Sequence, residues 1–331
     1  MKKLITALML GACVSLATTS ASAADAKTKL EPITYLLPAP KSLPAFAPWL
    51  IAQEEGYFRD AGLDVTFVTG KGGVDVAKQV GAGNAPIGGA IGDTPIIVRA
   101  NGIPVKSVAV LGAGSLTLIA SHAKDPVTKP AQLKGRTITV MAYTDTTYYS
   151  LLGTMKKAGL TRNDADIQAA GPAGVWQLFA AGKASVMAGV PEWVVSARES
   201  GAKVDIMSPS EGFDSMAQAI LASDDLIKNN PQLIQKIVTA TLKGMELIMK
   251  NPDAAVTAYI KAVPSHKGQE AQIRQVFDLY NKYVYANQKV PGEMNAARLS
   301  KVQDFYVSEG IVSKATPLDD LYTNQFVGNG K

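Results

Sequence analysis

The stretch from Gly88 to Ile97 has the residue types of a strand end, a tight turn and a helix start. Glycines at 88, 89 and 92 permit close approach of backbone or ligand. Thr94 followed by Pro95 is typical of an N-cap and a first helical position, where free amide groups attract anions and polar oxygens. A capped helix that binds nothing explains the same residues. The sequence leaves open whether Asp93 contacts a ligand or caps this helix.

Four further polar turns each follow a predicted strand, at residues 38–46, 69–73, 143–147 and 191–193. Ligands of open parallel sheets bind beyond the carboxyl ends of the strands, so two facing lobes would bring these turns to one cleft. Asp93, Asp145 and Glu192 are each explained as a cap or a solvated loop residue, but their shared placement favours a ligand site. Aromatic walls for this cleft could come from four residues, which core packing also explains: Tyr143, Tyr148, Trp176 and Trp193.

The sequence lacks the motifs of catalysis and of cofactor binding. His122 and His266 are the only histidines, and neither has a second ligand at metal-like spacing. No Gly-x-Ser-x-Gly motif occurs, and residues 70–72 and 81–86 fail the phosphate-loop and dinucleotide patterns. We therefore expect no metal, no cofactor and no enzymatic activity.

Residues 1–23 have the pattern of a secretory signal peptide, with Lys2 and Lys3, an apolar run and Ala21-Ser22-Ala23 as cleavage site. The apolar run is short for a membrane anchor, and a lipoprotein site at Cys13 is the weaker alternative. Cys13 is the only cysteine, so the mature chain has no thiol, which suits an oxidising periplasm. The mild net charge of +5, with both signs interspersed, argues against nucleic-acid binding.

Predicted strands and helices alternate along the chain. Strands at 33–37, 62–68 and 105–111 are separated by helices, and the alternation starts afresh at 134–141. This pattern predicts an α/β fold in two lobes, with mostly parallel sheets and helices on both faces. A strand at 217–222 returns the chain to the first lobe, and amphipathic helices follow from residue 223.

Several segments in this order resemble periplasmic solute-binding proteins of ABC importers, in the branch that includes nitrate-, taurine-, alkanesulfonate- and thiamine-pyrimidine-precursor-binding proteins. The segments that carry the resemblance lie at residues 52–65, 92 with 100–105, 133–136, 178–184 and 251–255.

The resemblance implies a type II, two-lobe periplasmic binding protein with two hinge crossings, which closes on a small molecule and delivers it to an ABC permease in the inner membrane. Lobe 1 is expected at 31–119 and 220–331, lobe 2 at 120–219, and the protein is expected to be a monomer in the periplasm. The residues that the resemblance places in the pocket are Lys41, Ser42, Phe46, Gly72, Gly92, Asp93, Thr94, Thr146, Thr147, Glu192 and Trp193.

The loop at 144–147 departs from the family pattern, because Thr-Asp-Thr-Thr stands where many relatives have a Gly-Ser pair. Asp145 would repel a simple oxyanion unless an amine also binds. Our leading hypothesis is a receptor for a small polar organic solute, similar to a sulfonate, taurine or nitrate. The alternatives are a receptor for a nitrogen heterocycle such as a thiamine pyrimidine precursor, a receptor that docks on a membrane sensor, and an enzyme related to thiamine-pyrimidine synthases.

Overall fold

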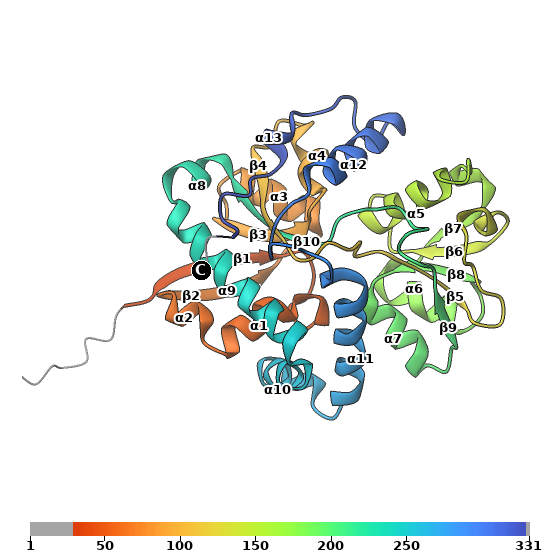
Figure 1. Cartoon of the computed structure of the whole chain (residues 1–331), viewed down its shortest axis with the longest axis horizontal. Coiled ribbons are helices and arrows are strands. Elements are labelled where there is room, and N and C mark those ends of the chain that lie inside the picture. Colours follow the sequence, from red (N-terminus) through yellow and green to blue (C-terminus); the bar gives the residue numbers. More distant parts are fainter. Residues whose placement is uncertain (1–28, 329–331) are drawn as a thin grey trace, which may run out of the picture.

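The computed structural model describes residues 29–328, so the predicted signal peptide and its Cys13 lie outside the described residues. Two lobes lie side by side along the long axis of the molecule, each built on one sheet (Figure 1). No helix within residues 29–328 has the length and apolar character needed to cross a membrane.

The first sheet has the strand order β2-β1-β3-β10-β4. Strands β1, β2 and β3 are parallel, and β10 is antiparallel to both of its neighbours, β3 and β4. Four of the five strands therefore share one direction. Their bounds are β1 Glu31–Leu37, β2 Leu63–Thr69, β3 Ile87–Ile91, β4 Val105–Val110 and β10 Gln218–Ser223.

The second sheet repeats this arrangement in the order β7-β6-β8-β5-β9, with β5 as its antiparallel strand. The mostly parallel sheets predicted from the alternation are confirmed. The strand bounds are β5 Leu118–His122, β6 Thr137–Val140, β7 Asp166–Ala169, β8 Val186–Gly189 and β9 Val204–Ile206. The short strand β7 was absent from the sequence prediction.

Two crossings connect the lobes, one from β4 to β5 and one from β9 to β10. Each crossing leads into the antiparallel strand of the sheet that it enters. The division predicted after residues 119 and 219 falls inside β5 and β10. Leu118 and Ile119 pair with β8 of the second sheet, whereas Gln218 and Ala219 pair with β3 of the first. We therefore place the division just before each of these strands.

Helices cover both faces of each sheet (Figure 1). On the first sheet α3 packs against one face, where a Cβ on Gly88 would lie 2.5 Å from Val76 Cγ1. The opposite face carries α1, whose Trp49 packs on Tyr35 with ring centroids 5.9 Å apart. The helices of the sheet-containing part are α1 Ala47–Glu54, α2 Tyr57–Asp60, α3 Gly73–Gly81, α4 Thr94–Arg99, α5 Thr146–Lys156, α6 Gly171–Ala180 and α7 Pro191–Glu199.

The chain after β10 is helical, as the amphipathic pattern predicts, and returns to lobe 1. Its long helix α9 packs on α1, and α11 reaches α7 of lobe 2. The apolar core of lobe 1 therefore continues into α6 and α7, while a smaller core fills the other side of lobe 2. The helices are α8 Asp224–Asn229, α9 Pro231–Lys250, α10 Pro252–Ala262, α11 Glu270–Tyr280, the π-helix η5 Asn281–Tyr285, α12 Ala296–Ser308 and α13 Leu318–Leu321.

Three helix starts differ from the prediction. Thr94 is the first residue of α4 and not its N-cap, a position that Asp93 holds. α5 begins at Thr146, inside the polar turn predicted at 143–147, because the Asp145 side chain caps it. α7 begins at Pro191, so Glu192 and Trp193 lie in the first helical turn.

Candidate ligand-binding site

The predicted polar turns follow the carboxyl ends of β1, β2 and β3 in lobe 1 and of β6 and β8 in lobe 2. The lobes meet next to these turns. Tyr149 of α5 packs edge-on against Tyr306 of α12 with centroids 5.5 Å apart, and Lys156 forms an ion pair with Glu309. On the other side, α7 contacts α11. The arrangement places the ends of both sheets at one interlobe region.

Asp93 is fully buried at the start of α4, and its carboxyl group does not cap the helix. Tyr306 donates a 2.8 Å hydrogen bond to its Oδ2, while Oδ1 has no hydrogen-bond partner among the described residues. Burial raises the pKa of Asp93 to about 6, the Tyr306 hydrogen bond lowers it, and the charge of Asp145 raises it. An orphaned buried carboxyl oxygen requires a proton or a partner from outside the chain.

Asp145 lies in the opposite lobe, where it is the N-cap of α5 and its charge acts on Asp93. Its Oδ1 accepts a 2.9 Å hydrogen bond from the Thr147 amide and a second bond from the Thr147 hydroxyl. Burial raises the pKa of Asp145, against the lowering effect of these bonds. The amide groups at the start of α5, which could otherwise attract an anion, are thus already supplied with a carboxylate by the protein itself.

Glu192 is the counterpart on the other side of the interlobe region. It is 7 % exposed and accepts a 3.0 Å hydrogen bond from the hydroxyl of Tyr280 on α11, in lobe 1. Burial raises the pKa of Glu192 to about 7, while its own backbone amide and Tyr280 lower it. A carboxyl group with this pKa changes its charge near neutral pH.

None of the three carboxyl groups is paired with a cation in the part of the chain that the structure describes. Within residues 29–328, neither Asp93, Asp145 nor Glu192 forms an ion pair with a lysine or arginine. The charge of Arg298 does lower the pKa of Asp93, but this is the weakest of the effects on that group. Buried carboxyl groups without cations favour a ligand that supplies hydrogen-bond donors or positive charge.

The predicted residues of the first-sheet turns differ in their burial and their contacts. Thr94 and Gly92 are buried beside Asp93, and a Cβ on Gly92 would lie 3.2 Å from Met294 Cε. Phe46 packs against Trp49 in the core. The carbonyl oxygen of Ser42 accepts hydrogen bonds from Tyr259 and His266, at 2.6 and 2.8 Å. Gly72 has a φ of +97°, and Lys41 is exposed.

The predicted residues of lobe 2 separate into two groups. Thr146, Thr147 and Asp145 lie together at the start of α5, and the charge of Asp145 acts on Asp93. Tyr143 is instead 44 % exposed and donates a 2.9 Å hydrogen bond to the carbonyl of Ile167. Trp193 is partly buried and packs over Gly189, where a Cβ would lie 2.9 Å from its ring. A place for Tyr143 and Trp193 in the ligand pocket stays a prediction.

The sequence reasoning missed the tyrosines that hold the carboxyl groups, Tyr280 and Tyr306, and also Tyr149 and Arg298. Tyr280 and Tyr306 do belong to the amphipathic stripes of the helical tail, so they were predictable as buried residues. Within the described part of the chain, no group of three or more His, Cys, Asp or Glu side chains is arranged to hold a metal ion.

Comparison with known proteins identifies the family. Residues 43–255 match the family described as NMT1/THI5 like. The chain belongs to the NMT1/THI5-like family. The matched segment includes both crossings and the three carboxyl groups of the candidate site, whereas Tyr280 and Tyr306 lie beyond it.

Relatives of this NMT1/THI5-like chain include proteins named for binding and proteins named for synthesis. The riboflavin-binding protein RibY of Chloroflexus aurantiacus is 25% identical over 331 residues, covering 95% of this chain and 91% of RibY. The 4-amino-5-hydroxymethyl-2-methylpyrimidine phosphate synthase of Aspergillus parasiticus is 24% identical over 242 residues, covering 67% of this chain and 68% of the synthase.

Solved structures confirm the predicted two-lobe fold of periplasmic binding proteins. The aliphatic sulphonate-binding protein SsuA of Escherichia coli superposes with a TM-score of 0.70 at 16% identity, over 90% of this chain and 93% of SsuA. The alkanesulfonate-binding protein SsuA of Xanthomonas axonopodis pv. citri, bound to MOPS, gives 0.68 at 17% identity, over 89% and 98%.

Proposed function

We propose that this protein is the periplasmic substrate-binding component of an ABC importer, which captures a small polar organic solute between its lobes and delivers it to a permease. The observation that carries the proposal is the buried Asp93 carboxyl group beside the contact between the lobes: its Oδ1 has no hydrogen-bond partner among the described residues, and the charge of Asp145 in lobe 2 acts on it. Family membership and the two-lobe fold of the SsuA proteins support this function.

The carboxyl groups define the chemistry of the solute. A plain anion such as nitrate would face Asp93, Asp145 and Glu192 without a paired cation, at an electrostatic cost. An amine, an amino-substituted heterocycle or a ring N–H would instead donate to them. We therefore rank nitrogen heterocycles and amine-bearing sulfonates such as taurine above simple oxyanions. The names of RibY and of the pyrimidine synthase are consistent with a heterocycle.

An enzymatic role is the competing proposal, because the pyrimidine phosphate synthases are relatives. Neither histidine hydrogen-bonds to Asp93, Asp145 or Glu192 within the described residues. His122 stacks on Phe179, and His266 bonds to Ser42 and Gln269. Neither is placed as a base or a ligand at the interlobe region. A binding role uses the observed groups without further chemistry, so we favour it.

The test is a thermal-shift panel on the mature protein, freed of bound solute by unfolding and refolding. The panel contains taurine, alkanesulfonates, nitrate, amino acids, aminopyrimidines and riboflavin. A ligand that binds only the folded state at 100 times its dissociation constant adds about 2.7 kcal/mol to the free energy of unfolding. We expect this response from a donor-bearing compound. A flat response to every compound would contradict a solute receptor, and turnover of a compound would support the enzyme.

The alternative to an ABC permease as partner is a membrane sensor on which the solute receptor docks. Uptake of labelled solute in cells with and without this protein distinguishes the two. Loss of uptake on deletion supports the importer, whereas unchanged uptake with a lost signalling response supports the sensor.

A further inference from the structure

Arg298 of α12 contacts both crossings between the lobes. Its guanidinium group donates hydrogen bonds to the carbonyl oxygens of Ala113 in the first crossing and of Asp214 and Ser215 in the second. It also forms a 2.9 Å ion pair with the Asp214 carboxylate, and it is only 8 % exposed. Arginine alone among side chains has a planar fork with five N–H donors. This fork can bond to three carbonyl groups that lie at different positions.

The lobe-1 ends of both crossings are therefore fixed to lobe 1. In the first crossing Gly114 also donates a 2.8 Å hydrogen bond from its amide to the Val284 carbonyl of η5. A Cβ on Gly114 would lie 1.8 Å from the Tyr283 carbonyl oxygen, so only glycine fits there. These contacts leave no room for the segment 112–114 to move relative to lobe 1.

The preceding part of the second crossing is held by α5 of lobe 2 instead. The Thr154 hydroxyl accepts a 2.9 Å hydrogen bond from the Phe213 amide, and Lys157 donates to the carbonyls of Ser210 and Gly212. The Phe213 ring lies against Gly153, where a Cβ would be 2.4 Å from the ring. The same ring also packs on Phe305 of α12 in lobe 1, with ring centroids 4.8 Å apart, so attachment passes from lobe 2 to lobe 1 across residues 213–215.

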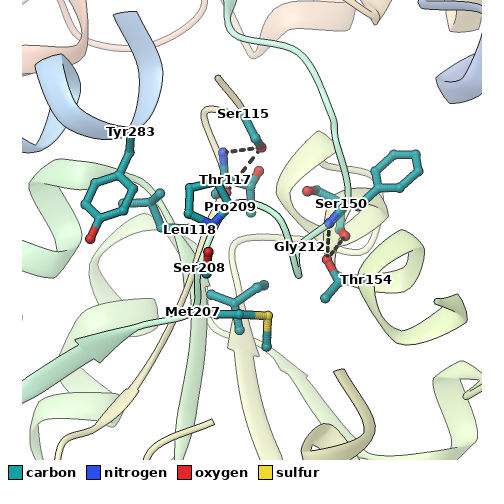
Figure 2. A pocket seen from close by; sticks show the side chains of 12 residues that line it. Ser115, Thr117, Leu118, Ser150, Thr154, Met207, Ser208, Pro209, Gly212 and Tyr283 are labelled. Carbon is teal, nitrogen blue, oxygen red and sulfur yellow. Dashed lines mark hydrogen bonds between the residues drawn. The ribbon is translucent and has the colours of Figure 1, made fainter. Parts of the chain in front are cut away.

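A chain of hydroxyl groups spans this change of attachment. The Ser115 and Ser215 hydroxyls, one from each crossing, are 2.6 Å apart, and Ser215 donates at 3.1 Å to Ser150 of α5. They lie beside a cavity of about 30 Å³, whose lining includes Ser115, Thr117, Ser150 and Gly212 (Figure 2). Single hydroxyl bonds next to a small void are the easiest contacts in this region to exchange.

We propose that Arg298 is a positioning residue that defines the hinge: it fixes both crossings to lobe 1, so the lobes rotate about residues 213–215 and 115–116. The hydroxyl chain from Ser115 through Ser215 to Ser150 then forms in the closed arrangement and breaks on opening. The hydrogen bond from Tyr280 to Glu192 also joins the two lobes, so the same rotation would break it.

The experiment measures the interlobe distance without any ligand, so it is independent of the proposed function. Nitroxide labels are attached at Lys78→Cys on α3 and Lys183→Cys after α6, both exposed positions, in a Cys13→Ser background. Their distance distribution is measured by pulsed electron resonance for the unsubstituted chain, for Arg298→Met and for Arg298→Lys. We expect Arg298→Met to shift the distribution to longer distances and to broaden it. Arg298→Lys, which keeps the charge but loses the fork, should give an intermediate shift.

The matched control is Arg274→Met on α11, which removes an arginine that pairs with Asp253 and Asp278 on the surface. It should leave the distribution unchanged. A folded Arg298→Met chain with an unchanged distribution would overturn the proposal, even if its melting temperature falls. If Arg298→Met fails to fold, Ser215→Ala and Ser150→Ala are measured with Ser308→Ala as control. An unchanged distribution in both would overturn the proposal, and a shift in either supports it.

Discussion

The hydroxyl of Tyr306 bonds to Asp93 while its ring packs against Tyr149 of the opposite lobe. One tyrosine thus connects a buried carboxyl group of lobe 1 with the closing surface of lobe 2. Tyr280 has the corresponding role for Glu192, this time with the hydrogen bond itself crossing between the lobes. The state of each carboxyl group is therefore linked to the contact between the lobes.

The raised pKa values predict how stability depends on pH. Asp93 has a pKa of about 6 in the folded protein against an ordinary 3.8, so the folded state binds the proton more tightly than the unfolded chain. The free energy of unfolding then falls as pH rises from about 4 to 6, by about 3 kcal/mol for this group. Urea unfolding between pH 4 and 8 should show a flatter profile for Asp93→Asn. Asp125→Asn, at an exposed carboxylate with a lowered pKa, is the control that should not flatten this fall.

Replacing Glu192 by glutamine removes the negative charge but keeps a side chain that accepts from Tyr280. We expect Glu192→Gln to weaken the binding of the solute identified by thermal shift by about 1 to 3 kcal/mol, the range for a buried polar group left without a partner. Titration calorimetry at pH 8 measures the change, since Glu192 is ionised there. Glu199→Gln, at the exposed end of the same helix, is the control. Equal affinities of the two variants would remove Glu192 from the site.

Asp145 has two roles that different substitutions separate. Asp145→Ala removes the cap of α5 and should lower the free energy of unfolding by about 1 kcal/mol. Asp145→Asn retains a capping oxygen for the Thr147 amide, so its stability should stay near that of the unsubstituted chain, while its affinity for an amine-bearing solute falls. Urea unfolding and calorimetry give the two readouts. Unchanged affinity in Asp145→Asn would show that this residue is a cap only.

Gly153 lies in the middle of α5, where alanine would ordinarily favour the helix by up to about 1 kcal/mol. Here a Cβ would overlap the ring of Phe213, so we expect Gly153→Ala to destabilise by about 1 to 3 kcal/mol. A double-mutant cycle with Phe213→Ala checks the cause by urea unfolding. The losses in free energy of unfolding of the two single variants should sum to more than the loss in the double variant. Simple additivity would mean that the overlap is not the source.

The sequence predicted the framework of the site because the framework is periodic. The strand ends of β1, β3, β6 and β8 follow from alternating apolar segments, and the polar turns follow from the strands. The role of Gly88 could not be predicted, since its need for glycine arises from packing against Val76 and not from a ligand. A single turn carries no information about the helix that will cover it.

The partners of the carboxyl groups could not be predicted for a related reason. An apolar stripe identifies Tyr280 and Tyr306 as buried, but the direction of a hydroxyl depends on how α11 and α12 cross the sheet ends. Asp93 illustrates the consequence. Its position before a helix suggested a cap. Its Oδ2 instead accepts a hydrogen bond from Tyr306, 213 positions later in the chain. Contacts at such separation are set by tertiary packing alone.

The placement of β5 and β10 also determines the order in which the two lobes can assemble during synthesis. All strands of the second sheet lie between Leu118 and Ile206, so lobe 2 has its complete sheet as soon as that segment is made. The first sheet must wait for β10, without which β3 and β4 have no strand between them. The sheet of lobe 2 can therefore be complete before that of lobe 1, whose core then closes against α6 and α7.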